Sequence, residues 1–99
     1  MANLKDMAYE SEIEELVEVE EHIGDEEQKS LVVYNDDFNT IDHVIETLIK
    51  VCKHDPIQAE QCTMLIHYRG KCSVKEGGYH FLNPMRQGIT DAGIKAAIV

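Results

Sequence analysis

Three polar residues in succession, Asn35, Asp36 and Asp37, follow an apolar run in the segment LVVYNDDFNTIDHVIETL, residues 31–48. In an extended chain alternate side chains point the same way, so Asn35 and Asp37 should share one side and Asp36 should face the other. Their side-chain oxygens accept hydrogen bonds, and the carboxylates carry negative charge. Beside an apolar wall, such a cluster suits a cation on a hydrophobic body. An α-ammonium group whose carbon carries a large apolar side chain fits that description.

A second polar residue, His67, lies in the segment MLIHYRG, residues 64–70. A neutral imidazole has one donor and one acceptor nitrogen, so His67 could add an acceptor to a cation site. Binding should then weaken as acidification protonates the ring. A simpler interpretation stays open at this point, in which Asn35–Asp37 form a turn and a helix cap, and His67 is an ordinary surface or core residue.

A strand and a helix are predicted on either side of the acidic cluster. Residues Leu31–Tyr34 are β-branched or aromatic for the most part, which favours a strand. A helix should follow, with Asn39 as its cap and Asp42 in its first turn. Apolar residues recur along it at helical spacing and predict one buried face: Ile41, Val44, Ile45, Leu48, Ile49 and Cys52.

The second helix is predicted between Asp55 and Gly70. Asp55 is a typical cap, Pro56 suits the first helical position, and Gly70 is typical of a helix end. Its buried face is expected to contain the larger apolar residues, namely Ile57, Cys62, Leu65, Ile66 and Tyr68.

The C-terminal third predicts two further strands. Cys72 and Val74 alternate in a short strand, and the segment IKAAIV, residues 94–99, indicates a final one with Ile94, Ala96 and Ile98 on one face. Between them, Pro84 and Gly88 leave room only for a short helix. This order of elements predicts an α+β fold, a small two-layer sandwich in which helices pack on one face of a three-stranded antiparallel sheet.

Charge divides the chain into an acidic extension, expected to be flexible, at residues 1–29 and a folded domain at residues 30–99. Residues 1–30 contain eleven acidic residues and two lysines, and therefore carry most of the net charge of −10. That density leaves too little apolar surface to offset chain ordering. Within the extension, Ser11 and Glu14 form a possible capping box for a weak partner-binding helix.

The remaining composition indicates a cytoplasmic protein. A basic surface for nucleic acid is missing, so we expect no DNA or RNA partner. No apolar run reaches the length of about 18 residues that a membrane span needs, and the acidic N-terminus does not look like a secretory signal. Three cysteines without short spacing suit reduced thiols. We expect a monomer with no membrane partner and no cofactor.

The two polar motifs together resemble those of the ClpS family, the adaptors of the Clp protease. The family pattern is Asn-Asp-Asp, an aromatic residue and a capped helix, then Met-Leu-x-x-His-x-x-Gly. Here YNDDFNTIDHVIETL is followed by MLIHYRGKC about thirty residues later. The resemblance covers residues 31–75 well and the final strand loosely. The ribosomal stalk protein's C-terminal domain has a related fold.

The resemblance implies an adaptor without enzymatic activity. Members of the family recognise proteins whose free N-terminal residue is Leu, Phe, Tyr or Trp, a signal called an N-degron. They deliver these proteins to the N-domain of a Clp AAA+ unfoldase, ClpA-like or ClpC-like, which is coupled to a peptidase. The family also has a flexible N-terminal extension, thought to be engaged by the unfoldase, which the acidic segment at residues 1–29 matches.

Carried over by position, the resemblance assigns two parts of a binding site. Asn35 and His67 would bind the α-amino group, and one or both of Asp36 and Asp37 would add negative charge, directly or through water, with Asp37 preferred for the contact from strand alternation. The pocket for the first side chain would consist of Val33, Tyr34, Asn39, Ile41, Val44, Thr63, Ile66 and Ile94. Plain core packing is expected for three further apolar residues: Ile45, Leu48 and Leu65.

Two pocket residues carry specific expectations. Ile41 occupies the family's gatekeeper position, where it would clash with the extra methyl of a β-branched first residue. Thr63 stands where the family commonly has Met, so a smaller, more polar floor that favours aromatic side chains is expected. Residues 76–93 look shorter and more broken than the family's third helix, and no unfoldase-docking residue is assigned.

Three other interpretations compete with this one. A metal site could use Cys52 with His54, or His67 with Cys72, although neither spacing matches a structural zinc site. A thiol hydrolase could use Cys72 and His67, but no helix N-terminus is placed to activate the thiol. The third is a protein-interaction module of related fold that does not bind N-degrons.

Overall fold

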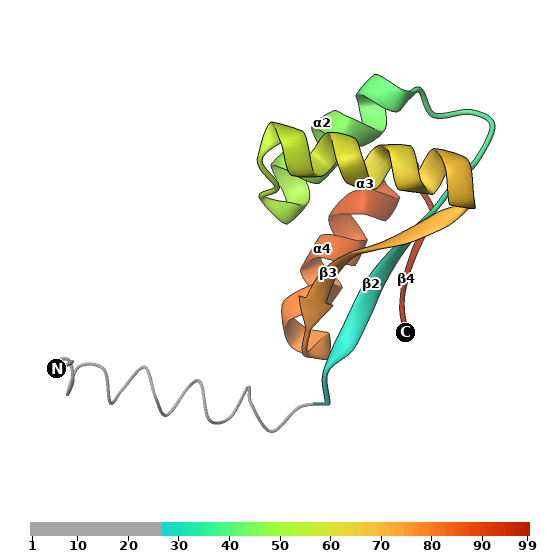
Figure 1. Cartoon of the computed structure of the whole chain (residues 1–99). Coiled ribbons are helices and arrows are strands. Elements are labelled where there is room, and N and C mark those ends of the chain that lie inside the picture. The colour runs from blue at the N-terminus through green and yellow to red at the C-terminus, as the bar shows by residue number, and fades with distance from the viewer. Residues whose placement is uncertain (1–26) are drawn as a thin grey trace, which may run out of the picture.

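The computed structural model describes residues 27–99; the possible capping box at Ser11 and Glu14 lies outside the described residues. The elements, in chain order, are β2 (Lys29–Tyr34), α2 (Ile41–Cys52), α3 (Pro56–Arg69), β3 (Lys71–Gly77), α4 (Tyr79–Asp91) and β4 (Ala96–Ile98), as Figure 1 shows. This is the predicted order. None of the helices in the described part of the chain has the length and apolar character that a membrane span would require.

Strand β2 is the centre of a three-stranded sheet in the order β3-β2-β4, and it is antiparallel to both neighbours. Leu31 and Val33 are fully buried, because alternate residues of a strand share a face and this face is covered. Leu31 and Val33 belong to a buried hydrophobic cluster that also contains side chains of α2, α3 and α4. The predicted two-layer α+β sandwich is therefore confirmed (Figure 1).

One hydrophobic core joins the helices to the sheet. Leu48 of α2 and Leu82 of α4 are at most 1% exposed, and burying each contributes about 1.5–3 kcal/mol. The remaining helix residues in this core are Val44 and Cys52 of α2, Ala59 and Ile66 of α3, and Ile89 of α4.

Helix α2 begins at Ile41, and Thr40 caps it. The Thr40 hydroxyl accepts a hydrogen bond from the backbone N–H of His43 at 3.0 Å. The prediction of Asn39 as the cap is wrong by one residue, because the Asn39 side chain makes other contacts. Asp42 lies in the first turn as predicted, where its charge complements the helix dipole.

Helix α3 begins and ends where the sequence predicts. The Asp55 side chain accepts a hydrogen bond from the backbone N–H of Gln58 at 2.8 Å, and Pro56 is the first helical residue. Gly70 ends the helix with a φ of 94°, a conformation that favours glycine.

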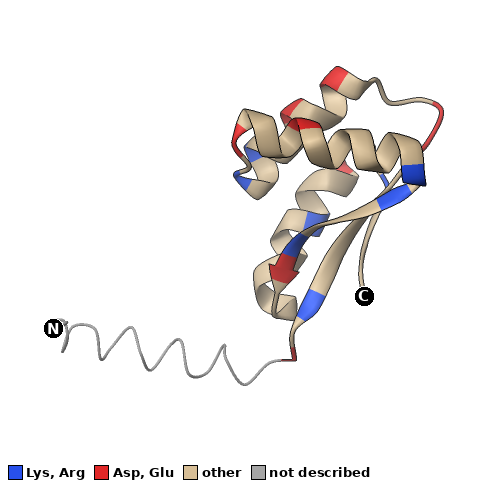
Figure 2. Ribbon diagram, in the orientation of Figure 1, with Lys and Arg blue, Asp and Glu red and all other residues tan. Residues whose placement is uncertain are grey.

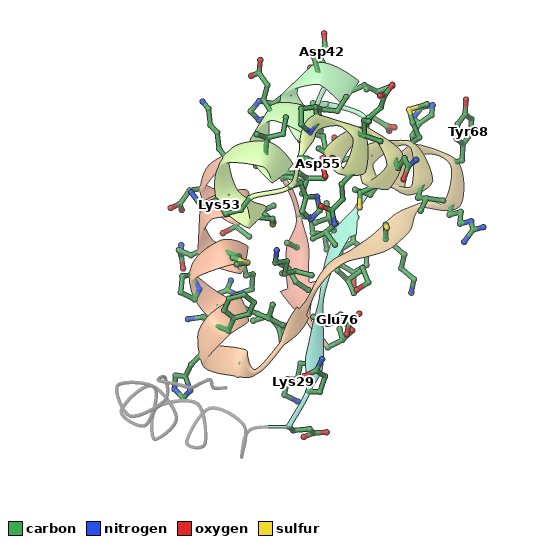
Figure 3. All side chains as sticks on the ribbon, turned by 60° about the vertical axis from the view of Figure 1, so that its left-hand side comes forward. Lys29, Asp42, Lys53, Asp55, Tyr68 and Glu76 are labelled. Atoms are coloured by element: carbon green, nitrogen blue, oxygen red, sulfur yellow. The ribbon has the colours of Figure 1, made fainter. Side chains whose placement is uncertain are left out.

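The predicted buried face of α3 is largely wrong. Ile57 and Tyr68 are 68% and 76% exposed, Leu65 is 37% exposed, and Figure 3 shows Tyr68 projecting from the body of the protein. Only Ile66 is buried and Cys62 half-buried, and the face is completed by small residues, Ala59 and Thr63. Because α3 carries apolar side chains on two faces, spacing alone could not select between them.

Helix α4 is longer than predicted, with 13 residues and Pro84 inside it. Its Gly88 lies against α2, where an added Cβ would approach Val51 Cγ1 to 3.0 Å. Pro84 and Gly88 have low helix propensity, but packing of α4 against the core through Leu82 and Ile89 compensates for it. The prediction of a short helix is therefore wrong.

Candidate functional site

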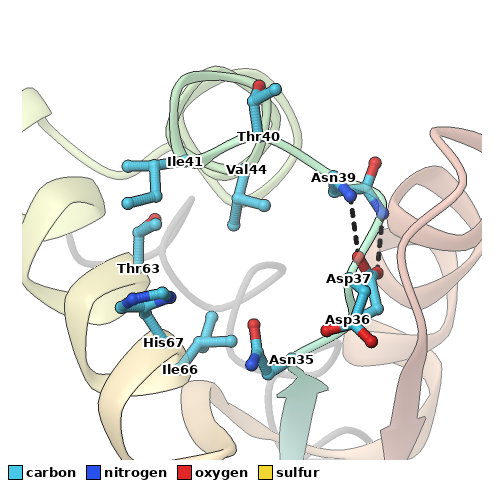
Figure 4. Close-up of a pocket in the computed structure, with 10 residues that line it drawn as sticks. All are labelled: Asn35, Asp36, Asp37, Asn39, Thr40, Ile41, Val44, Thr63, Ile66 and His67. Atoms are coloured by element: carbon cyan, nitrogen blue, oxygen red, sulfur yellow. Dashed lines mark hydrogen bonds between the residues drawn. The ribbon is translucent and has the colours of Figure 1, made fainter.

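A cavity of about 380 Å³ opens where the end of β2 meets the first turn of α2 and the second half of α3 (Figure 4). Its size is within the range of small-ligand pockets, about 300–1,000 Å³. Ten residues line it: Asn35, Asp36, Asp37, Asn39, Thr40, Ile41, Val44, Thr63, Ile66 and His67. The two motifs singled out in the sequence therefore meet in one place.

A backbone contact at Asn35 brings the motifs together. The Asn35 N–H donates a hydrogen bond to the Gly70 carbonyl at 2.9 Å. Gly70 caps α3, whose last turn carries His67. The end of β2 is therefore held beside the end of α3, and the side chains of Asn35 and His67 lie on the same side of the cavity (Figure 4).

The cavity has a polar rim and a largely apolar floor. The rim residues Asn35, Asp37 and His67 are exposed. The floor residues Val44, Thr63 and Ile66 are only 8%, 2% and 3% exposed, and Figure 4 shows these three side chains around the central space. A ligand with a charged head and an apolar body would match this division.

The polar groups of the rim are available to a ligand. Within residues 27–99, no hydrogen bond or ion pair engages the side chains of Asn35, Asp37 or His67. The His67 ring has an edge-on contact with the ring of Tyr68, at 5.1 Å between centroids. Of the residues that line the cavity, only Asp36 and Asp37 are acidic, so its negative charge comes from the loop after β2. Figure 2 shows basic residues at the α3–β3 turn.

Asp36 differs from its neighbour Asp37, because the Asp36 carboxylate already accepts hydrogen bonds within the loop. Oδ1 accepts hydrogen bonds from the backbone N–H groups of Phe38 at 2.9 Å and Asn39 at 2.7 Å, and Oδ2 accepts one from Asn39 Nδ2 at 2.7 Å. Hydrogen bonds from the backbone and side chain of Asn39 are the main cause that lowers the pKa of Asp36. Asp36 therefore shapes the loop, as Asp commonly does in turns.

Asn39 also ties this loop to the far end of the chain. Its Nδ2 donates a second hydrogen bond, to the Gly93 carbonyl at 3.0 Å. One residue earlier, the Ala92 carbonyl accepts a hydrogen bond from His43 Nε2 at 2.9 Å. Asn39 thus lies at the cavity, as expected, and also holds the loop against the turn between α4 and β4.

Three residues expected in the pocket lie elsewhere. Val33 and Ile94 are 0% and 3% exposed and belong to the core. The Tyr34 ring is covered by Lys95 Nζ, 5.3 Å from its centroid. Alternation along β2 explains the positions of Val33 and Tyr34, since Val33 faces the helices and Tyr34 the opposite side. Sequence reasoning missed Thr40, which lines the cavity; its place directly before the first apolar helical residue was the available signal.

The alternative metal and thiol sites are not assembled in the described residues. Within residues 27–99, no group of three or more His, Cys, Asp or Glu side chains is placed to hold a metal ion. Burial raises the pKa of Cys52 to about 11, which disfavours the thiolate that metal binding needs. His54 is buried and donates from Nε2 to the Val74 carbonyl at 2.8 Å. No hydrogen bond in this part of the chain joins His67 to Cys72.

Comparison with known proteins found one matching family and similar solved structures. The model of the family described as ATP-dependent Clp protease adaptor protein ClpS matches residues 25–96. Among solved structures, ClpS2 of Agrobacterium tumefaciens bound to L-phenylalaninamide is similar in fold, with a TM-score of 0.62 and 14% sequence identity. That match covers 73% of this chain and 94% of the Agrobacterium chain.

Proposed function

The chain belongs to the ClpS family of Clp protease adaptors, and we propose that it recognises proteins by a free N-terminal Leu, Phe, Tyr or Trp and delivers them to a Clp AAA+ unfoldase. The observation that carries this proposal is a single cavity in which exposed, unpaired polar side chains border a buried apolar floor. The proposed ligand has the same two parts, an ammonium group and an apolar side chain on one carbon.

In this proposal the rim binds the α-ammonium group. An ammonium group has three N–H donors, and the rim offers three acceptors: Asn35 Oδ1, the Asp37 carboxylate and a neutral ring nitrogen of His67. A hydrogen bond to a charged group contributes about 1.5–3 kcal/mol. Asp37 is the direct acceptor in this proposal, because the Asp36 carboxylate already accepts hydrogen bonds from Phe38 and Asn39. Asp36 also lines the cavity and keeps its charge, so it adds to the negative potential there.

The floor accepts the first side chain. Burying a Leu or Phe side chain against Val44 and Ile66 contributes about 1.5–3 kcal/mol. Together with three hydrogen bonds, the contacts total roughly 6–12 kcal/mol before the cost of association is subtracted. Since that cost is several kcal/mol, useful affinity requires the rim and the floor together. Neither part alone would retain a substrate.

This division explains why the amino group must be free. An acetylated or formylated N-terminus loses its charge and two of its three donors, so the acceptors of the rim stay unpaired. The related Agrobacterium protein was solved with L-phenylalaninamide. That molecule combines a free α-amino group with an aromatic side chain, which is the ligand chemistry proposed for the cavity between Asn35 and Thr63.

In this proposal the protein catalyses no reaction itself. Recognition would be its contribution, and unfolding and cleavage would belong to the protease it serves. A ClpA-like or ClpC-like N-domain is the partner we propose, in the cytoplasm, where the thiols of Cys52, Cys62 and Cys72 would stay reduced.

Titration calorimetry with a short peptide that begins with Phe tests the proposal. The free peptide should bind with a micromolar or lower Kd, and the N-acetylated peptide should bind at least about 100-fold more weakly, since two or more charged hydrogen bonds are lost. Equal capture of the two peptides, or of neither, would favour the interaction module that does not bind N-degrons.

A further inference from the structure

One buried polar group at the cavity has no partner. Thr63 is 2% exposed, lines the cavity, and its Oγ1 makes no hydrogen bond within the described residues. A buried helical Thr can satisfy its hydroxyl by donating to the carbonyl four residues earlier. Thr47 of α2 does so, to the His43 carbonyl at 2.8 Å. The Thr63 hydroxyl therefore retains an unused donor and an unused acceptor in an apolar setting.

The position of Thr63 determines what could reach it. Thr63 lies four residues before His67 on α3, so the two side chains are neighbours on one face of the helix. Ile41 and Val44 of α2 line the same cavity, and Figure 4 shows Ile41 next to Thr63. If the rim holds the ammonium group at His67, the first side chain starts at the exposed end of the cavity. Its far end then points toward the buried end, where Thr63 lies.

We propose that Thr63 makes this cavity select for an N-terminal Tyr over Phe and Leu. The phenolic hydroxyl of Tyr both donates and accepts hydrogen bonds and stands at the far end of the ring, so it can pair with the Thr63 hydroxyl. Phe and Leu would leave that hydroxyl unpaired. Sites built to hydrogen-bond a ligand group discriminate strongly against analogues that lack it. This inference rests on the proposed function, because the rim must first fix the depth of the side chain.

The test compares peptides that differ only in their first residue, Tyr, Phe or Leu, by titration calorimetry. Wild type should bind the Tyr peptide about 5- to 20-fold more tightly than the Phe peptide, the effect of one buried hydrogen bond. Thr63→Val keeps the shape of the side chain and removes the hydroxyl, so it should abolish this preference and bring the Tyr-to-Phe affinity ratio close to one. Thr63→Ser keeps the hydroxyl and should retain the preference.

Equal affinity of wild type for the Tyr and Phe peptides would overturn the inference, as would an unchanged Tyr-to-Phe ratio in Thr63→Val. The wild-type ratio needs no variant, and the melting temperature of each variant checks its folding. Capture of an N-acetylated Tyr peptide as tightly as the free one would contradict the proposed function instead, so the two failures are distinguishable.

Discussion

Asp36 and Asn39 are joined by two hydrogen bonds of 2.7 Å, one from the Asn39 backbone N–H and one from its side-chain amide. Asp37, between them in sequence, has no such bond and faces the cavity. The two adjacent carboxylates therefore have different surroundings: Asp36 holds the loop, whereas Asp37 is free to contact the ammonium group that we propose as ligand. Separate substitutions can distinguish these two roles.

Asp37→Asn should weaken binding of a Phe-initiated peptide about 10- to 100-fold, because the ammonium group loses a charged acceptor. The melting temperature should not change, since the Asp37 side chain has no partner to lose. Asp36→Asn should lower the free energy of unfolding by about 1 kcal/mol, because its new amide opposes that of Asn39. Similar losses of affinity in both variants, measured by calorimetry, would contradict this separation. Full affinity in the Asp36→Ala/Asp37→Ala double variant would remove both carboxylates from the binding site.

The hydrogen bonds to Asp36 should also appear in the acid stability of the protein. They favour the charged carboxylate, so its pKa in the folded state lies below the ordinary 3.8. The stability that these bonds add is fully present when the pH is above the pKa of Asp36 in the unfolded state. It is lost as the pH falls through the pKa of Asp36 in the folded state. Urea unfolding should show that the advantage of wild type over Asp36→Asn shrinks on acidification below about pH 4. Because the side chain is only partly buried and solvent screens its charge, the change should stay under about 1 kcal/mol. A constant difference would contradict the account.

Peptide affinity should fall on acidification, because only a neutral imidazole has a ring nitrogen that accepts a hydrogen bond. A protonated His67 would also repel the ammonium group. The peptide amino group gains rather than loses charge on acidification, so it does not cause the weakening. His67→Ala serves as the control, with weaker and nearly pH-independent binding. A flat profile in wild type would exclude His67 as an acceptor.

Ile41→Ala should admit β-branched first residues. Ile41 is the first residue of α2, is 39% exposed and lines the cavity, so its removal widens the entrance at small cost in stability. An Ile-initiated peptide should bind the variant at least about 10-fold more tightly than it binds wild type, as relief of overpacking allows. The Phe-initiated peptide is the reference, and its affinity should change little. Unchanged affinity for the Ile-initiated peptide would mean that Ile41 is not the residue that excludes β-branched side chains.

Deletion of residues 1–26 should leave peptide affinity within about twofold, because the cavity is built from residues 35–67 and β2 begins at Lys29. Stimulated degradation by the unfoldase and its peptidase should fail, if the acidic extension takes part in transfer. A degradation assay with a Phe-initiated model substrate measures this. A neutral flexible extension of equal length is the control. Full activity of the shortened protein would reduce the extension to a solubility tail.

Local side-chain chemistry made parts of the fold predictable. Asp55, Pro56 and Gly70 each act within a few residues of their own position, so the limits of α3 could be predicted. The buried face of α3 could not, because it depends on which of two apolar faces the sheet and α2 cover. For α4, the local preference of Pro84 predicted a helix that is too short, because tertiary packing outweighed this preference.

Most of the residues that line the cavity were predictable for a different reason. Periodicity does not indicate that Asn35 meets His67; a hydrogen bond between distant residues, from Asn35 to Gly70, brings them together. Family resemblance supplied that pairing, and nine of the twelve residues named from it line the cavity. The other three, Val33, Tyr34 and Ile94, depend on strand orientation and core packing.

A crystal structure of the protein with a Phe-initiated peptide tests the central claim most directly. We expect the peptide's α-amino nitrogen within hydrogen-bond distance of Asn35 Oδ1, the Asp37 carboxylate and a ring nitrogen of His67, about 2.7–3.2 Å from each. The Phe ring should lie between Val44 and Ile66. An amino group directed into solvent, or a ring bound outside this cavity, would contradict the account.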